Sequence, residues 1–301
     1  MSTPKLSFIV VAYDMQREVP RTLESLMIPY QIGCSPEDFE IILIENNSKN
    51  VLDKKSIESQ FPNVRYFLNK INPSSPSYAM NLGLQHAKGE AVAFCIDGAR
   101  MMSPGIVKGI LNAQCLFDDF VVATHAYHLG SEPQNVSVPS GRYNQIKEDE
   151  LLASADWQSD GYKLFDISVL ALSSRAGWFG AIAESNCIAL SKKSAIELGG
   201  YSEEFVTLGG GYANLDFYAR AQQLKNHQLV YLLGEGTFHQ VHGGVATNRD
   251  DTPHDDYKNE YVKIRGAEFK TKPLPEDVFY LGVIHPSSKG VLIDSVKELK
   301  S

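Results

Sequence analysis

The sequence predicts an α/β fold in which helices flank a mostly parallel central sheet. Short apolar runs rich in β-branched residues alternate with segments of helical period, as in a parallel sheet covered by helices. The chain has 301 residues, which is enough to bury one large core. Hydrophobic residues make up 43% and charged residues 21% of the chain, which is the composition of a globular protein.

The expected strands are apolar runs with no helical period, which is typical of strands buried on both faces of a sheet. LSFIVVA near the N-terminus and AVAFCI farther along are two such runs. The seven expected strands span residues 6–12, 39–44, 64–68, 91–96, 120–126, 185–190 and 229–233.

The expected helices lie between these runs. The first places Val19, Leu23 and Leu26 on one face. Ser77 is suited to cap the second helix, and Pro104 fits the first turn of the third. The five expected helices span residues 19–26, 77–87, 104–116, 192–198 and 214–224.

We expect one domain over residues 1–244 and a polar C-terminal extension with partial helicity over residues 245–301. From about residue 130 to 180, Ser, Pro, Gln, Asn and Gly are frequent and periodicity is weak, which indicates an irregular insertion. Loops of that length are usually functional or disordered.

Charge and cysteine content exclude several classes of protein. The formal charge of −8 argues against a nucleic-acid partner, which requires a basic surface. The 4 cysteines form no C-x-x-C pair, so neither a zinc site nor a disulfide framework is indicated. Because the sequence shows no secretory leader and no apolar run of membrane-spanning length, we expect a cytoplasmic protein. Peripheral association with the inner face of a membrane stays open, as does the oligomeric state.

Polar residues directly follow three expected strands, at the sheet edge where α/β proteins bind ligands. Tyr13 offers a flat apolar face to a base, and Glu45 can accept hydrogen bonds from a base or a ribose. Alternatively, Glu45 and Asn47 begin a turn and cap a helix. The three sets are Ala12-Tyr13-Asp14, Glu45-Asn46-Asn47-Ser48 and Asp97-Gly98-Ala99-Arg100.

Several ordered motifs resemble those of the inverting glycosyltransferases of family 2, which share the GT-A fold. They cover roughly the first four-fifths of the chain, and their joint order is more specific than any single match. The resemblance implies a nucleotide-diphospho-sugar transferase that passes a sugar, from a uridine-linked donor, to the hydroxyl of a glycan or other acceptor with inversion. It also implies a role in surface polysaccharide or glycoconjugate synthesis. The motifs are FIVVAYDMQREVPRTLESL, IILIENNS, SYAMNLGLQHAKGEAVAFCIDGARMMSP, SNCIALSKKSAIELGGYSEEF and FHQVHGG.

The family's acidic motif usually carries two carboxylates that hold a divalent cation on the donor phosphates. Here Asp97 keeps the first position, whereas Ala99 replaces the second and Arg100 follows. Either Asp97 and His242 hold a Mn or Mg ion, which we favour, or Arg100 supplies part of the positive charge for the diphosphate. We expect neighbouring His239 to be structural. The donor-binding residues implied are Ala12, Tyr13, Asp14, Glu45, Asn47, Asp97, Gly98 and Arg100.

The family's general base usually comes from an adjacent Glu-Asp pair, which Ala213 and Asn214 replace here. An Asn side chain cannot take up a proton at neutral pH, so Asn214 is expected to bind the acceptor rather than act as its base. The candidate bases are Asp216 and Glu184, although Asp216 has the helical spacing to pair with Arg220 instead.

An aromatic platform for the acceptor sugar is expected from Trp178 and Phe179, with core packing as the alternative. The replacements at Ala99 and Asn214 also keep open a catalytically silent protein that binds a sugar nucleotide or a glycan. A nucleotidyltransferase is disfavoured, because no glycine-rich loop with basic residues follows Ala12.

Overall fold

The computed structural model describes residues 3–71, 74–245, 247–249 and 251–298. Its strands are β1 Leu6–Ala12, β2 Phe39–Asn46, β3 Val64–Asn69, β4 Ala91–Cys95, β5 Arg100–Met102, β6 Phe120–Leu129, β7 Ser168–Leu170, β8 Cys187–Ser191, β9 Gln228–His239 and β10 Phe279–Gly282. Its helices are α1 Glu18–Glu24, α2 Lys54–Gln60, α3 Ser77–His86, α4 Ile106–Leu116, α5 Gln134–Ser137, α6 Gln145–Ala155, α7 Lys192–Glu197, α8 Ala213–Ala221, α9 His254–Arg265 and α10 Lys289–Glu298.

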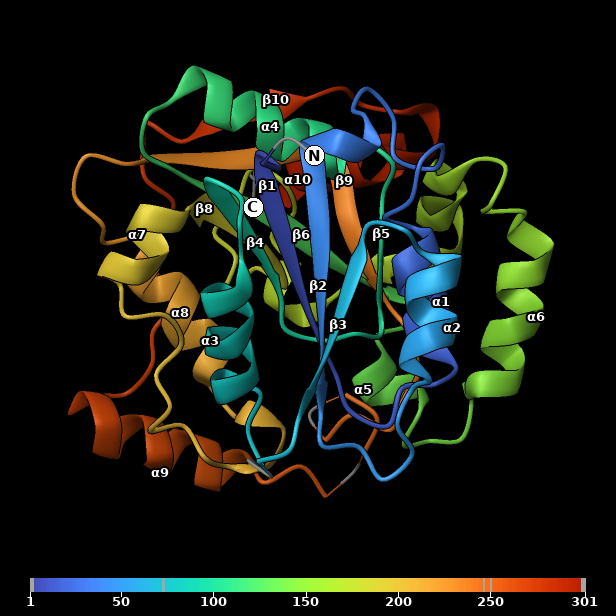
Figure 1. Ribbon diagram of the computed structural model, residues 1–301, viewed down its shortest axis with the longest axis horizontal. Coiled ribbons are helices and arrows are strands. Elements are labelled where there is room, and N and C mark those ends of the chain that lie inside the picture. The colour runs from blue at the N-terminus through green and yellow to red at the C-terminus, as the bar shows by residue number, and fades with distance from the viewer. Residues whose placement is uncertain (1–2, 72–73, 246, 250, 299–301) are drawn as a thin grey trace.

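The strands form one sheet in the order β10-β9-β6-β8-β4-β1-β2-β3, with β5 on β9 and β7 on β6. Strand β8 runs antiparallel between β4 and β6, while β1 pairs in parallel with both β2 and β4. In Figure 1, α3, α7 and α8 lie on one side of the sheet, and α1 and α2 lie on the other. The predicted α/β class with a mostly parallel sheet is confirmed.

The two faces of the sheet carry separate hydrophobic cores, which explains why the central strands are apolar throughout. Phe8 and Val10 of β1 pack on one face with residues of α1 and α4. Ile9 and Val11 pack on the other face with residues of α3, α7 and α8. Because successive side chains of a strand point to opposite faces, all four are buried.

The insertion has a hydrophobic core of its own rather than an irregular interior. Helices α5 and α6 lie within it, and a third cluster joins Trp157, Leu164 and Trp178 to Tyr127 and Phe238 of the sheet. The weak hydrophobic periodicity of residues 130–180 therefore results from short helices and strands, not from an absence of structure.

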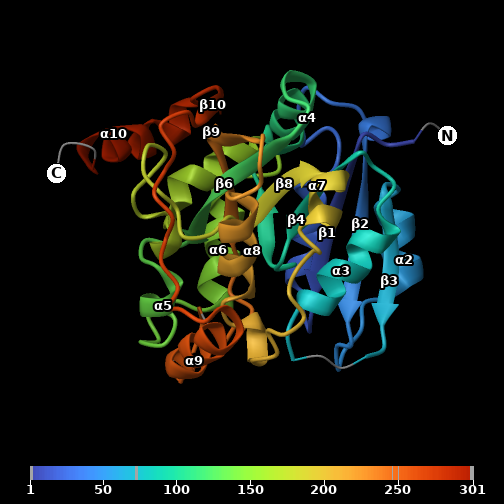
Figure 2. The same cartoon turned by 90° about the vertical axis from the view of Figure 1, so that its left-hand side faces the viewer.

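The C-terminal segment, which we expected to be a polar extension, takes part in the sheet. Strand β10 pairs in parallel with β9 and forms one edge. Helix α9 lies at the end of the molecule to which β1, β2 and β3 point (Figure 2). The carboxylate of Glu260 in α9 accepts hydrogen bonds from the backbone N–H groups of Val206 and Thr207, both at 2.8 Å.

All seven predicted strands and five predicted helices are present among the described residues, with ends shifted by a few positions. The largest difference is β9, predicted over residues 229–233, which continues to His239. None of the helices in the described part of the chain is both long and apolar enough to cross a bilayer.

Candidate functional site

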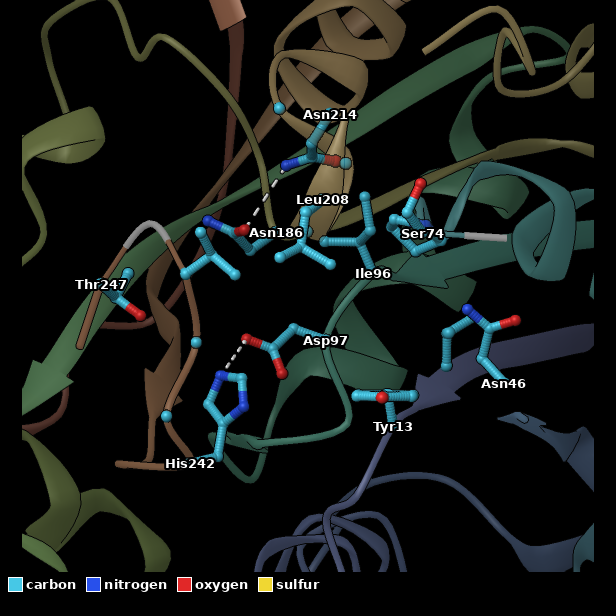
Figure 3. Close-up of a pocket in the computed structure, with 18 of the residues that line it drawn as sticks. Tyr13, Asn46, Ser74, Ile96, Asp97, Asn186, Leu208, Asn214, His242 and Thr247 are labelled. Carbon is cyan, nitrogen blue, oxygen red and sulfur yellow. Dashed lines mark hydrogen bonds and ion pairs between the residues drawn. The ribbon is translucent and has the colours of Figure 1, made fainter. Parts of the chain in front are cut away.

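A cavity of about 850 Å³ opens at the carboxyl ends of the parallel strands. Strands β1, β2 and β4 contribute Tyr13, Asn46 and Asp97 from the loops or positions at which they end. Later segments add His242 after β9 and Asn214 in α8 (Figure 3). The structure therefore brings together residues from most of the chain at the sheet edge where the sequence placed a ligand site.

The loop after β4 is held so that Asp97 faces the end of β9. Gly98 donates its N–H to the carbonyl of Val11 at 2.7 Å, and an added Cβ would lie only 3.0 Å from that oxygen. Beyond the loop, β5 pairs with β9 so that Arg100 lies opposite His239. The pairing of β5 with β9 thus places Asp97 and Arg100 next to His239 and His242.

Asp97, His239 and His242 form a compact cluster on the cavity wall. Asp97 Oδ2 lies 2.9 Å from His239 Nε2 and 3.4 Å from His242 Nε2. The two imidazole Nε2 atoms are 3.2 Å apart. Among the described residues, these three are the only His, Cys, Asp and Glu side chains that converge closely enough to hold a metal ion.

Burial and the cluster's charges act in opposite directions on its pKa values. Burial alone would raise the pKa of Asp97, but its interactions with His242 and with His239 outweigh burial and lower that pKa well below its usual range. Burial lowers the pKa of His239 to about 4, assisted by Arg100, against the opposing effect of Asp97. For His242, the attraction of Asp97 overcomes burial, and the pKa is raised.

The cluster fits a divalent cation. Zinc and similar ions bind imidazole nitrogen and carboxylate oxygen at about 2.0–2.2 Å, which places neighbouring ligand atoms about 2.8–3.6 Å apart at angles from octahedral to tetrahedral. The three distances within the cluster, 2.9, 3.2 and 3.4 Å, match this spacing. An ion there would be bound by one carboxylate and two imidazoles.

Arg100 adds a buried positive charge with unused hydrogen-bond donors beside this cluster. Its side chain is 7% exposed and lines the cavity, and its Nε lies 3.9 Å from Asp97 Oδ2. Neither Nε nor Nη1 has a hydrogen-bond partner within the described part of the chain. A buried guanidinium with unused donors is suited to bind the oxygens of an anionic ligand.

A second polar group lies around Glu184, before β8. Its Oε2 accepts a hydrogen bond of 2.7 Å from Asn214 Nδ2, and Asn214 Oδ1 accepts one of 3.0 Å from the hydroxyl of buried Tyr201. The same Nδ2 lies 3.4 Å from Asn186 Oδ1 (Figure 3). Glu184, Asn186 and Asn214 all line the cavity, so this carboxylate has access to a ligand.

Of the expected donor-binding residues, Tyr13, Asp14, Asp97 and Arg100 line the cavity. The other four do not line it, and each has a structural role in its own loop or in the core instead. The buried carboxylate of Glu45 accepts hydrogen bonds from the Ser48 hydroxyl and the Leu52 N–H. Ala12 is packed in the core, Gly98 turns the chain, and Asn47 takes a positive φ of 54° in the turn after β2.

Asp216 does not reach the cavity. It is 1% exposed, and its Oδ1 accepts a hydrogen bond of 2.6 Å from Arg265 Nε. Its Oδ2 accepts hydrogen bonds of 2.8 Å from both Arg220 and Arg265. Since both oxygens are engaged by arginines, the geometry fits an ion pair that joins α8 to α9, as the helical spacing with Arg220 had suggested, and leaves Glu184 as the candidate base.

The expected aromatic platform at Trp178 and Phe179 is not part of the cavity. Trp178 is fully buried in the core of the insertion, and Phe179 packs edge to face on Tyr280 at 5.5 Å. Two other aromatic residues, Tyr212 and Tyr257, line the cavity instead.

The sequence did not place His239 at the site, whereas the structure puts it on the cavity wall beside Asp97. The available signal was the pair of histidines in FHQVHGG, His239 and His242. Only His242 is followed by glycines, and a histidine without such a context is more often structural than a ligand. Tyr257 was also missed, because it lies in the C-terminal segment that was expected to be an extension.

Comparison with solved structures shows the same fold. The crystal structure of S. aureus TarS matches with a TM-score of 0.56 at 14% identity, over 88% of this chain and 40% of TarS. A shorter form of TarS in complex with UDP-GlcNAc gives the same TM-score over 68% of that chain. Its complex with UDP gives 0.52 at 12% identity, over 98% of this chain and 65% of that one. This chain thus spans less than half the length of the longer TarS chain.

No curated protein matches the sequence. The sequence model of glycosyl transferase family 2, however, matches residues 7–170, which is more than half of the chain. This match includes β1, β4 and Asp97, and the parallel sheet with its cavity at the strand ends agrees with the GT-A fold. The chain therefore belongs to glycosyl transferase family 2.

Proposed function

We propose that this enzyme transfers a sugar from a uridine-linked nucleotide diphosphosugar to an acceptor hydroxyl with inversion, in the synthesis of a surface polysaccharide or glycoconjugate. One observation carries the proposal. A single cavity is lined on one wall by Asp97, Arg100 and His242 and on another by Glu184 and Asn214. The first group suits a diphosphate, and the second suits a hydroxyl that must lose a proton.

On the donor side, Tyr13 is 45% exposed at the cavity and offers its ring to the base of the nucleotide. Asp97 and His242 would hold a Mn or Mg ion, which would neutralise charge on the leaving diphosphate. Arg100 would donate hydrogen bonds to the phosphate oxygens. The structurally similar TarS was crystallised in complex with UDP-GlcNAc and with UDP, which supports a uridine-linked donor here.

On the acceptor side, Glu184 would act as the general base. The acceptor hydroxyl gives its proton to Glu184 while its oxygen bonds to the anomeric carbon, and the bond from that carbon to the diphosphate oxygen breaks. Attack from the side opposite the diphosphate inverts the anomeric configuration. Figure 3 shows Asn214, the hydrogen-bond partner of Glu184, apart from Asp97 and His242 in the same cavity, which supports an acceptor bound on a different wall from the donor phosphates.

Asn214 would orient this base rather than replace it. Its Nδ2 donates to the carboxylate of Glu184 at 2.7 Å, and the Tyr201 hydroxyl fixes the amide from behind. An amide at this position adds no second negative charge next to Glu184, whereas a carboxylate would.

The test is a panel of UDP-sugars incubated with Mn or Mg and a mixture of glycan acceptors. UDP release and product mass measure transfer, and NMR of the product gives the anomeric configuration. We expect transfer with inversion that Glu184→Gln abolishes while donor binding persists. Donor binding by calorimetry with no transfer or hydrolysis across the panel would instead support a catalytically silent binding protein.

A further inference from the structure

We propose that Asp97, His239 and His242 together bind a cation in this protein. Gln134 of the insertion fixes the tautomer and the ring orientation of His239, so that its Nε2 can bind the ion. This ligand set selects a transition-metal ion over magnesium. This inference rests on the proposed function in one respect only, that the bound ion would neutralise the donor diphosphate. Its test requires no nucleotide sugar.

Gln134 is fully buried in α5 and is held in one orientation. Its Nε2 donates hydrogen bonds to two backbone carbonyls, those of His239 at 2.8 Å and Leu129 at 3.3 Å. Because only the NH₂ group of an amide can donate, these two carbonyls determine which end of the side chain is oxygen. Its Oε1 therefore faces His239.

That oxygen lies 2.6 Å from His239 Nδ1. An amide oxygen only accepts hydrogen bonds, so Nδ1 must carry the hydrogen. In the neutral imidazole, Nε2 then has the free lone pair. Nε2 is also the atom that lies 2.9 Å from Asp97 Oδ2 and 3.2 Å from His242 Nε2, so Gln134 presents a ligand atom to the cluster.

Outer partners of this kind are a regular feature of metal sites in proteins. A histidine ligand commonly donates its second ring N–H to a fixed acceptor, which sets its tautomer and ring orientation. The insertion also holds the next part of the same loop, since Glu148 Oε2 accepts a hydrogen bond of 2.9 Å from the N–H of Val241. The insertion thus supports the backbone of both histidines.

The ligand set itself determines which ions the site favours. Magnesium prefers oxygen ligands and loses water reluctantly, whereas imidazole nitrogen suits later first-row transition metals. Two imidazoles and one carboxylate therefore favour cobalt or zinc over magnesium, and manganese, which stands lowest in the first-row order, should bind between them. The change of the family's second acidic position to Ala99 agrees with a cation that gains a nitrogen ligand instead of an oxygen one.

The experiment is calorimetric titration of the metal-free full chain with Co²⁺, Mn²⁺ and Mg²⁺, with the visible spectrum of Co²⁺ as a second readout. We expect Co²⁺ to bind one site at least 10-fold more tightly than Mg²⁺. Gln134→Leu should weaken Co²⁺ binding about 10- to 100-fold. His239→Ala should weaken it at least as much and change the cobalt spectrum. Ser137→Ala, in the same helix as Gln134, is the matched control and should bind as the wild type does.

Thermal melts establish that each variant is folded, and His239→Ala decides the result if Gln134→Leu does not fold. Absence of Co²⁺ and Mn²⁺ binding in the wild type, equal binding of Mg²⁺, or unchanged binding in the folded His239 or Gln134 variants would overturn the inference. Sugar transfer supported by Mg²⁺ without Co²⁺ binding would reject this inference alone. Metal binding without any transfer would reject only the proposed function.

Discussion

Replacing Arg100 by Met should stabilise the free protein and weaken its binding to a nucleotide. The side chain is 7% exposed, and its Nε and Nη1 donate no hydrogen bond to any described residue. The nearest carboxylate oxygen, on Asp97, is 3.9 Å away, which is too far for a strong hydrogen-bonded pair. A buried charge with so little compensation should cost the free protein stability, and its unused donors should bind an anionic ligand.

The magnitudes follow from this environment. Methionine has similar length, so Arg100→Met removes the desolvation cost without a large cavity, and the free energy of unfolding should rise by about 1–2 kcal/mol. Hydrogen bonds from a charged donor contribute about 1.5–3 kcal/mol, so the dissociation constant for UDP should rise roughly 10- to 100-fold.

Urea denaturation measures the first effect, and calorimetric titration with UDP measures the second. Arg65→Met is the matched control, because Arg65 Nη1 binds Glu40 Oε2 at 2.7 Å and the His86 carbonyl at 3.0 Å and does not line the cavity. The control should lose stability by about 1 kcal/mol and bind UDP normally. If Arg100→Met is less stable than the wild type and binds UDP equally well, the role given to this arginine is wrong.

Two further predictions separate catalysis from stability, and a third concerns the pH dependence of stability. Glu184→Gln should lower turnover about 100- to 10,000-fold while unfolding at the same urea concentration, because the amide keeps an oxygen for the Asn214 hydrogen bond; near-normal turnover would remove Glu184 as the base. Asp216→Asn should do the reverse, since it weakens the buried contacts to Arg220 and Arg265: we expect a loss of about 2–4 kcal/mol in unfolding free energy, with turnover of the folded fraction preserved. Finally, burial lowers the pKa of His125 to about 4, below the value of about 6.5 in an unfolded chain. The neutral form therefore favours folding, and the stabilisation is present above about pH 6.5 and is lost as the pH falls through 4. His125→Gln should flatten the stability profile in this window by on the order of 3 kcal/mol, and an unchanged slope would contradict the assignment.

Much of the fold could be predicted because its signal is local. The central strands are buried on both faces, so their sequences are continuously apolar. The helices between them each have one apolar face. What escaped prediction lacks that local signal. The second half of β9 contains the polar and glycine-rich stretch GEGTFH, and β10 is a strand of 4 residues at an edge of the sheet.

The candidate site was predictable where a residue follows a strand directly, as Tyr13 and Asp97 do. Position at a strand end does not, however, determine where a side chain points. Glu45 binds its own loop, while its neighbour Asn46 lines the cavity. His239 could not be assigned because its contact with Asp97 depends on the pairing of β5 with β9, which is a long-range feature of the sheet.

The most direct measurement of the central claim is calorimetric titration of UDP into the wild type and Asp97→Ala, each with Mn²⁺ and with excess chelator. We expect UDP to bind the wild type tightly only when the ion is present, and Asp97→Ala to lose this dependence together with most of its affinity for UDP. Equal UDP binding in all four titrations would mean that the cavity at the strand ends does not hold a diphosphate through Asp97 and a cation.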